Sequence, residues 1–226
     1  MKAVCEIYQA APALYKEGVH VISIDEKPGI QALQSKAPLQ RMEAGQVERR
    51  EFEYIRHGTL CLTANFEVAT GQVVTPTIEP TRTEEQFAAH IQRLLDTDPE
   101  GEWIFITDHL NTHLSESLVR LVAERCKTSD ELGRKGKSGI LQSKATRETF
   151  LEEKNHRIRW IYTPKHCSWL NQIEIWFSIL TRRLLKRASF ASLEELERRL
   201  RQFIDYFNRT MAKPFKWTYA GKPLQA

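Results

Sequence analysis

Three acidic residues, Asp25, Asp108 and Glu174, stand where carboxylates could bind metal ions. The first two follow short apolar runs, Val19–Ile24 and Trp103–Thr107, and the third lies in a run with helical periodicity. Mg²⁺ prefers oxygen ligands and is usually held by one or two carboxylates together with water and substrate phosphate. Two such ions, roughly 3.5–4 Å apart, can hold the attacking and leaving oxygens of a phosphodiester. The residues therefore predict phosphoryl transfer with two Mg²⁺ (or Mn²⁺) ions.

Each carboxylate also has an ordinary structural explanation. Asp25 could simply end a strand, and Asp108 could be a turn or capping residue, which is a common place for aspartate. Glu174 follows Asn171 by three residues, the spacing of a capping box at a helix start. A metal site is therefore predicted only if the fold brings the three residues together.

The first elements that would position these residues are extended. A turn at Glu67–Gly71 separates the last of them from the others, and the pattern predicts an antiparallel meander. The extended runs are Val19–Ile24 (ended by Pro28 and Gly29), Arg50–Ile55, Thr59–Asn65 (joined to the preceding run by a turn at His57–Gly58) and Gln72–Ile78.

Helices and two further strands follow the meander. The order predicts an α/β fold, a mixed sheet flanked by helices, with its core at about 19–187. In open sheets of this kind, sites gather beyond the carboxyl ends of central strands. The predicted strands are Trp103–Thr107 and Arg157–Thr163, and the predicted helices are Thr83–Leu95 (with a capping box from Thr83 to Gln86), Ser115–Arg125, Asn171–Lys186 and about 192–207 (capped by Ser192).

Positive charge is concentrated in the second half of the chain, although the overall net charge is only +4. Residues 127–154 contain the run GRKGKSG and are predicted to form a mobile basic loop, with a short helix at Thr146–Glu153. The asymmetry indicates a face that binds a polyanion, and the alternative is two solvated faces of opposite sign. The candidate contacts to a DNA backbone are Lys27, Lys165, His166, Arg182, Lys186, Arg134, Lys135 and Lys137.

Other classes of protein are not indicated. No apolar run reaches the roughly 18 residues that a membrane span needs, and the first residues do not form a signal peptide. The four cysteines are widely separated, so neither a zinc site nor a disulfide framework is predicted. A reducing, cytoplasmic setting is expected.

Three blocks of the sequence resemble the motif blocks of bacterial insertion-sequence transposases related to the mariner superfamily. The blocks are IDEKPGIQAL (Ile24–Leu33), ITDHLNTH (Ile106–His113) and YTPKHCSWLNQIEIWFSIL (Tyr162–Leu180). The resemblance implies a ribonuclease-H-like fold and a DDE catalytic triad formed by Asp25, Asp108 and Glu174. It also makes His109, Asn111, His113 and Asn171 candidates for supporting the triad, and residues 1–226 a single catalytic domain.

The resemblance further implies a reaction and its partners. Water would cleave DNA at a transposon end, and the freed 3′-hydroxyl would then attack target DNA. Transposon ends and target DNA are the expected partners, with two copies of the chain paired on DNA at the nucleoid and no membrane association. Two alternatives remain open: a structure-specific nuclease of the same fold, and an inactive remnant that only binds nucleic acid.

The sequence departs from the family pattern in three places. His109 stands where the family usually has asparagine, and the stretch between Asp108 and Glu174 is longer than usual because of the basic loop. Few residues precede Asp25, so the family's N-terminal helix-turn-helix region is expected to be absent. A separate protein or domain would then recognise the DNA ends.

Overall fold

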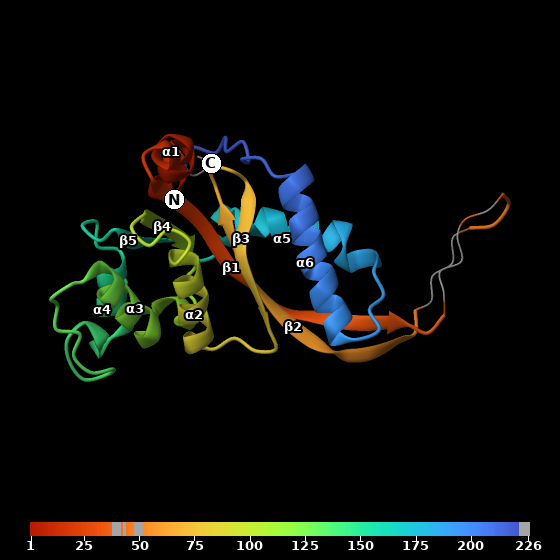
Figure 1. The fold of residues 1–226 in the computed structure, drawn as a ribbon, viewed down its shortest axis with the longest axis horizontal. Helices are drawn as coiled ribbons and strands as arrows, with labels where there is room; N and C mark the ends of the chain where they lie inside the picture. Colours follow the sequence, from red (N-terminus) through yellow and green to blue (C-terminus); the bar gives the residue numbers. More distant parts are fainter. Residues whose placement is uncertain (38–41, 43, 48–51, 222–226) are drawn as a thin grey trace, which may run out of the picture.

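The centre of the computed structural model, which describes residues 1–37, 42, 44–47 and 52–221, is a five-stranded sheet (Figure 1). The strand order is β3-β2-β1-β4-β5. The first three strands pair antiparallel, and β4 and β5 continue the sheet in parallel from β1. This mixed sheet confirms the predicted α/β class. The strands are β1 (Val19–Ser35), β2 (Tyr54–Glu67), β3 (Gln72–Glu79), β4 (Glu102–Thr107) and β5 (Ile158–Tyr162).

Helices cover both faces of the sheet, and each face has its own core. Side chains of a strand alternate between faces, so Val21 of β1 lies in one core and Ile22 and Ile24 lie in the other. One face carries α1 (Lys2–Lys16), α5 (Ile173–Arg183) and α6 (Leu193–Thr210), and the other carries α2 (Glu84–Leu95), α3 (Glu116–Cys126) and α4 (Lys144–Leu151). Within the described ranges, no helix combines the length and apolarity that crossing a membrane requires.

Strand β1 does not end at Pro28 and Gly29, so that prediction is wrong. Its pairing with β2 shifts register between Lys27 and Ile30, where β1 contains an extra residue. Gly29 has φ +65°, a left-handed conformation that glycine adopts without strain. The dipeptide is therefore a β-bulge that bends the strand, and β1 continues to Ser35.

The predicted turn at His57–Gly58 is also wrong, because residues 54–67 form one strand. A second register shift lies opposite these residues, between Gln31 and Leu33 of β1. Gly58 has φ +126°, and a Cβ there would lie 3.1 Å from a methyl carbon of Leu193 in α6. The glycine thus permits both a bulge and the close approach of α6. Of the predicted run that begins at Arg50, residues 50 and 51 lie outside the described residues.

The predicted helices are present, but their first and last residues differ from the predicted ones. Thr83 and Gln86 form the expected capping box, and Ser115 and Ser192 cap α3 and α6. Helix α5 is shorter than predicted and is followed by a 3₁₀ turn, Leu185–Arg187, so Lys186 does not continue its basic face. Helix α1 was not predicted, although its buried side chains recur with helical spacing: Val4, Cys5, Tyr8 and Ala11.

The basic segment 127–154 is more structured than predicted. A 3₁₀ turn, Ile140–Gln142, leads into α4, whose first residue is Lys144 rather than the expected Thr146. Leu141, Phe150 and Leu151 are buried in the core on the α2–α3 face. The apolar residues of this segment therefore fix it to the domain, and its tip around Arg134–Ser138 is an exposed turn.

Candidate active site

Asp25 and Asp108 lie at the same level of neighbouring strands. Strands β1 and β4 pair in parallel, and the last pair in register joins Ser23 to Ile106. Each aspartate lies two residues further along its own strand direction. Asp108 directly follows β4, as predicted, whereas Asp25 lies within β1, which continues as a partner of β2 alone. The site is thus at the carboxyl end of the parallel part of the sheet, where the fold predicts it.

The two aspartates affect each other electrostatically. Asp25 is buried (8% exposed), and this burial together with the negative charge of Asp108 raises the pKa of Asp25 to about 7. Two carboxylates in this arrangement disfavour simultaneous ionisation without a cation between them. The donors are hard oxygens, so the pair fits Mg²⁺ or Mn²⁺.

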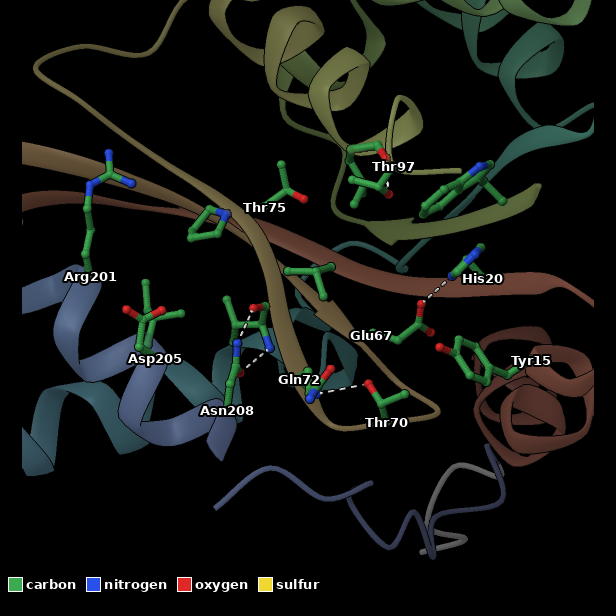
Figure 2. Close-up of a pocket in the computed structure, with 16 residues that line it drawn as sticks. Tyr15, His20, Glu67, Thr70, Gln72, Thr75, Thr97, Arg201, Asp205 and Asn208 are labelled. Carbon is green, nitrogen blue, oxygen red and sulfur yellow. Dashed lines mark hydrogen bonds and ion pairs between the residues drawn. The ribbon is translucent and has the colours of Figure 1, made fainter. Parts of the chain in front are cut away.

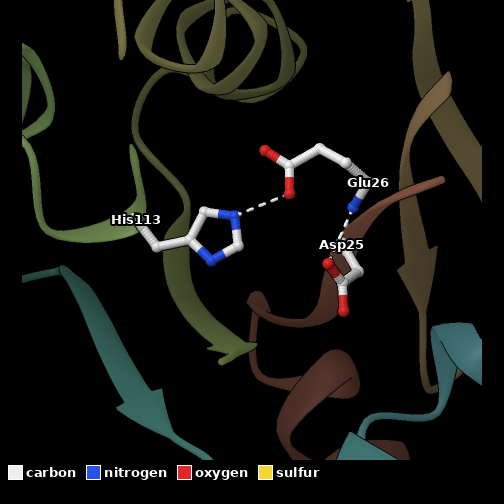
Figure 3. Close-up of side chains that lie close together, drawn as sticks. All are labelled: Asp25, Glu26 and His113. Atoms are coloured by element: carbon white, nitrogen blue, oxygen red, sulfur yellow. Dashed lines mark hydrogen bonds and ion pairs between the residues drawn. The ribbon is translucent and has the colours of Figure 1, made fainter. Parts of the chain in front are cut away.

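His113 is fully buried and joins Asp108 to a second acidic residue, Glu26. Its Nδ1 lies 2.8 Å from Asp108 Oδ1. Its Nε2 lies 3.0 Å from Glu26 Oε2 (Figure 3). Burial alone would lower the pKa of His113, but the hydrogen bonds to Asp108 and Glu26 raise it to about 10. The imidazole is therefore a cation at neutral pH, and both of its nitrogens donate.

Asp108 is held in its ionised form by this contact. Its partial burial would raise its pKa, but the hydrogen bond from His113, the charge of His113 and the Leu110 N–H together lower the pKa below its usual value. With both ring nitrogens occupied by carboxylates, His113 is placed to orient Asp108 rather than to contact a phosphate.

Glu26 was not recognised from the sequence. A possible metal-ligand atom of Glu26 lies within 4.8 Å of one from Asp25 and one from His113, and those two lie within the same distance of each other (Figure 3). Because both nitrogens of His113 donate, the ring has no lone pair for a metal, and we assign Glu26 as its counter-ion rather than as a ligand. The sequence contained one sign of Glu26, the two consecutive acidic residues Asp25 and Glu26. Consecutive side chains of a strand point to opposite faces of the sheet, so the two carboxylates start from different faces.

Asn171 brings the start of α5 to Asp25. It is fully buried, and its Nδ2 donates to the Ile24 carbonyl (2.9 Å) and to Asp25 Oδ2 (3.3 Å). The alternative that Asn171 and Glu174 form a capping box is wrong, because the N-cap of α5 is Gln172 and no side chain caps it from within the helix. Asn171 therefore contacts Asp25 directly, and its role in supporting the site stays a prediction.

Glu174 lies in the first turn of α5 and is partly exposed. Within the part of the chain that the structure describes, it makes no hydrogen bond or ion pair with either aspartate. It lines a hollow of about 230 Å³ together with Lys27 and Arg182. Its assignment as the third metal ligand stays a prediction.

A second hollow, of about 400 Å³, lies beside Asp108 and is also lined by Lys165 and His166. Four of the predicted DNA contacts thus share a hollow with a predicted catalytic carboxylate: Lys27 and Arg182 with Glu174, and Lys165 and His166 with Asp108. Lysine and arginine side chains beside carboxylates that are predicted to bind metal are what a bound phosphodiester backbone requires.

The other predicted DNA contacts lie elsewhere. Lys186 is exposed in the 3₁₀ turn after α5. Arg134, Lys135 and Lys137 are exposed at the tip of the basic segment, where Lys135 Nζ lies 3.0 Å from Glu84 at the start of α2. None of these residues lines either hollow.

The loop after Asp108 is braced by α4. His109 Nε2 lies 2.9 Å from Glu148, and Lys144 Nζ donates to Asn111 Oδ1 (3.2 Å) and to the His109 carbonyl (2.6 Å). These contacts tie the loop after Asp108 to α4, and a supporting role of His109 and Asn111 in the site stays a prediction.

A separate cavity of about 640 Å³ lies near the first residues of β1, between β3, α6 and the end of α2 (Figure 2). His20 and Glu67 line it and are joined by a hydrogen bond of 2.8 Å. No residue predicted to bind metal or DNA is among its lining residues.

The pKa of Asp25 makes metal binding sensitive to pH. Below about pH 7 a metal must displace a proton from Asp25, so Mn²⁺ affinity is expected to fall by up to about tenfold per pH unit as the pH decreases, and to level off above pH 7. Calorimetric titration in two buffers of different ionisation enthalpy measures the affinity and the protons released. The same affinity at about pH 6 and pH 8 would contradict this description of Asp25.

Solved structures of the Mos1 mariner transposase have the same fold as this chain. The chain is similar to the Mos1 paired-end complex with left transposon end (TM-score 0.54, 16% identity, covering 96% of this chain and 55% of that one). It is also similar to the Mos1 paired-end complex with Mn (TM-score 0.52, 14% identity, 91% and 54%) and to the Mos1 strand transfer complex (TM-score 0.51, 12% identity, 91% and 53%). The chain spans about half the length of these chains.

The likeness confirms the predicted ribonuclease-H-like arrangement of a mixed sheet between helices. No curated protein sequence matches the chain. A family model does match, over residues 20–197, and its description is DDE superfamily endonuclease. These residues include Asp25, Asp108 and Glu174. The chain belongs to the family of DDE superfamily endonucleases.

Proposed function

We propose that this chain is the catalytic domain of a DNA transposase, which cleaves DNA at transposon ends and joins the freed 3′-hydroxyl to target DNA. The observation that carries the proposal is the placement of Asp25 and Asp108 at one level of adjacent parallel strands, with Asn171 holding the helix of Glu174 against Asp25. The Mos1 complexes of the same fold support it, because one is a paired-end complex with the left transposon end and another is a paired-end complex with Mn.

Asp25, Asp108 and Glu174 would hold two Mg²⁺ or Mn²⁺ ions. When bound, such ions lower the pKa of the attacking water or 3′-hydroxyl and neutralise the leaving oxygen. The protein has to position the DNA backbone and maintain the charge of the site, since phosphoryl transfer needs no covalent enzyme intermediate. His113 orients Asp108 and keeps it ionised. The proposed backbone contacts are Lys27, Lys165, His166 and Arg182 in the two hollows.

We also propose how the chain works with its partners. Two copies act together on paired DNA ends at the nucleoid, each as a single catalytic domain. A separate protein or domain recognises the end sequence. Light scattering of the chain with and without DNA tests the pairing, and a monomer on bound DNA would contradict it.

A strand-transfer selection tests the proposed activity. The chain is incubated in Mn²⁺ with a target plasmid and a library of duplexes that have random ends and free 3′-hydroxyls, and joined products are amplified and sequenced. Joints to the plasmid are expected, without a preferred end sequence, because a separate protein or domain recognises the ends. Plasmid nicking without any joint would identify a nuclease instead, and absence of both products would identify an inactive remnant.

Charge removal in the hollows is expected to weaken DNA binding. Lys165→Ala and Arg182→Ala should each lower the slope of log affinity against log salt by about 0.9, because each removes one phosphate contact. Fluorescence anisotropy with duplex DNA at several salt concentrations measures the slope. Arg120→Ala is the matched control, since Arg120 is exposed on α3 and paired with Glu116. Unchanged slopes in both variants would remove these residues from the DNA path.

A further inference from the structure

The start of α5, which carries Glu174, is capped by side chains from other elements. The first N–H groups of a helix have no partner within the helix, and Gln172 provides no side-chain cap here. Instead, the Gln172 N–H donates to the hydroxyl of Tyr8 in α1 (3.2 Å). The Ile173 N–H donates to the hydroxyl of Ser23 in β1 (2.9 Å). The hydroxyls of Tyr8 and Ser23 thus accept the hydrogen bonds that a side-chain cap would otherwise accept.

The same two hydroxyls also donate into the turn that precedes α5. The Tyr8 hydroxyl donates to the Leu170 carbonyl (2.8 Å), and the Ser23 hydroxyl donates to Asn171 Oδ1. Tyr8 therefore holds the backbone on both sides of Asn171, and Ser23 holds its side chain. Asn171 in turn donates to Asp25 Oδ2. Hydrogen bonds from Tyr8 to the backbone on both sides of Asn171, and from Asn171 to Asp25, thus connect α1 to a predicted metal ligand.

These contacts are shielded from water. Tyr8 is 4% exposed, and Ser23 and Asn171 are fully buried. The ring of Trp217 packs edge-on against Tyr8, with the centroids 4.9 Å apart. Water cannot easily replace a hydrogen bond in such surroundings, so loss of the Tyr8 hydroxyl would leave the Leu170 carbonyl and the Gln172 N–H unpaired.

We infer that Tyr8 is a positioning residue for the metal site: its hydroxyl fixes Asn171 against Asp25 and fixes the first turn of the helix that carries Glu174. The inference rests on the proposed function. Tyr8 lies outside residues 20–197, the part that matches the family model, so this support comes from a segment that the family comparison does not cover. Residues that orient metal ligands commonly change metal affinity when they are replaced.

Calorimetric titration of the full chain with Mn²⁺ tests the inference. Tyr8→Phe removes one oxygen atom and is expected to weaken Mn²⁺ binding about tenfold, the lower end of the effect of outer-shell substitutions. Tyr15→Phe removes the same atom from the same helix at an exposed position (42% exposed) and is expected to bind Mn²⁺ like the wild type. A role in folding alone would lower the unfolding temperature of Tyr8→Phe without changing its Mn²⁺ affinity below that temperature.

A double-substitution cycle shows whether Tyr8 acts through Asn171. The losses of affinity in Tyr8→Phe and Asn171→Ala are expected to be less than additive in the double variant, because both remove the same contact to Asp25. If Tyr8→Phe does not fold, Ser23→Ala takes its place in the titration. Wild-type affinity in a folded Tyr8→Phe, or additive losses, would overturn the inference alone. Failure of the wild type to bind Mn²⁺ would overturn the proposed function, and this inference with it.

Discussion

Asp108→Asn is expected to reduce metal-dependent DNA cleavage by about a thousandfold or more, because bound metal supplies several kcal/mol of transition-state stabilisation and about 1.4 kcal/mol corresponds to a factor of ten. The asparagine side chain retains the shape of aspartate and can still accept a hydrogen bond from His113. It lacks the negative charge that a divalent ion needs. The loss should therefore be one of activity rather than of folding.

Nicking of supercoiled plasmid in Mn²⁺ measures this effect, with circular dichroism as the check on folding. Asp25→Asn and Glu174→Gln are expected to show losses of the same size. Asp205→Asn is the control, because Asp205 is an exposed carboxylate on α6 and lines neither hollow. Plasmid cleavage by Glu174→Gln at the wild-type rate would exclude Glu174 as the third ligand while leaving the two aspartates in place.

His113→Ala is expected to lower the free energy of unfolding by about 3–5 kcal/mol, because it leaves the buried carboxylate of Glu26 without its counter-ion. The Glu26 side chain is only 1% exposed, so water cannot solvate it in place of the imidazole. For a chain of this size the melting temperature should fall by roughly 10 °C or more. Urea denaturation measures the free energy directly.

A second substitution separates the charge of Glu26 from the packing of His113. Glu26→Gln in the His113→Ala background should restore part of the lost stability, since it removes the uncompensated charge. A loss below about 1 kcal/mol in His113→Ala would mean that the ion pair is not formed in solution.

The raised pKa of His113 predicts the direction in which the free energy of unfolding changes with pH. Its pKa in the folded protein, about 10, lies above the ordinary value of 6.5, so its contribution is fully present below about pH 6.5. The contribution is lost as the pH rises through 10. The wild type should therefore lose more stability than His113→Ala between these two values, and equal losses would contradict the assignment of a charged imidazole.

The sequence was sufficient to place Asp25 and Asp108 at two strands and Glu174 on a helix, but not to place the strand ends. Pro28–Gly29 and His57–Gly58 have the composition of turns. They form bulges because β1 and β2 remain paired beyond them, and that pairing depends on residues far away in the chain. Local composition cannot distinguish a turn from a bulge when the partner strand is unknown.

The residues that contact the predicted ligands were not recognised from the sequence for a related reason. Glu26 and His113 are separated by 87 positions, yet their side chains are joined by a hydrogen bond in the folded chain. Tyr8 and Leu170 are separated by 162 positions, and α1 itself was not predicted. Motif spacing identifies residues that act on a substrate, whereas residues that hold them are recognised only once the packing of the helices on the sheet is known.

The central claim, that these carboxylates bind the metal ions of DNA cleavage, is tested most directly by changing the ligand atom. Asp108→Cys replaces a hard oxygen with a soft sulfur, which binds Mg²⁺ poorly and accepts softer divalent ions. Asp108 is accessible enough for this substitution, since its side chain is 41% exposed. Plasmid cleavage by Asp108→Cys is expected to be lost in Mg²⁺ and substantially restored in Mn²⁺. Full activity in Mg²⁺, or no recovery in Mn²⁺, would contradict a metal bound at Asp108.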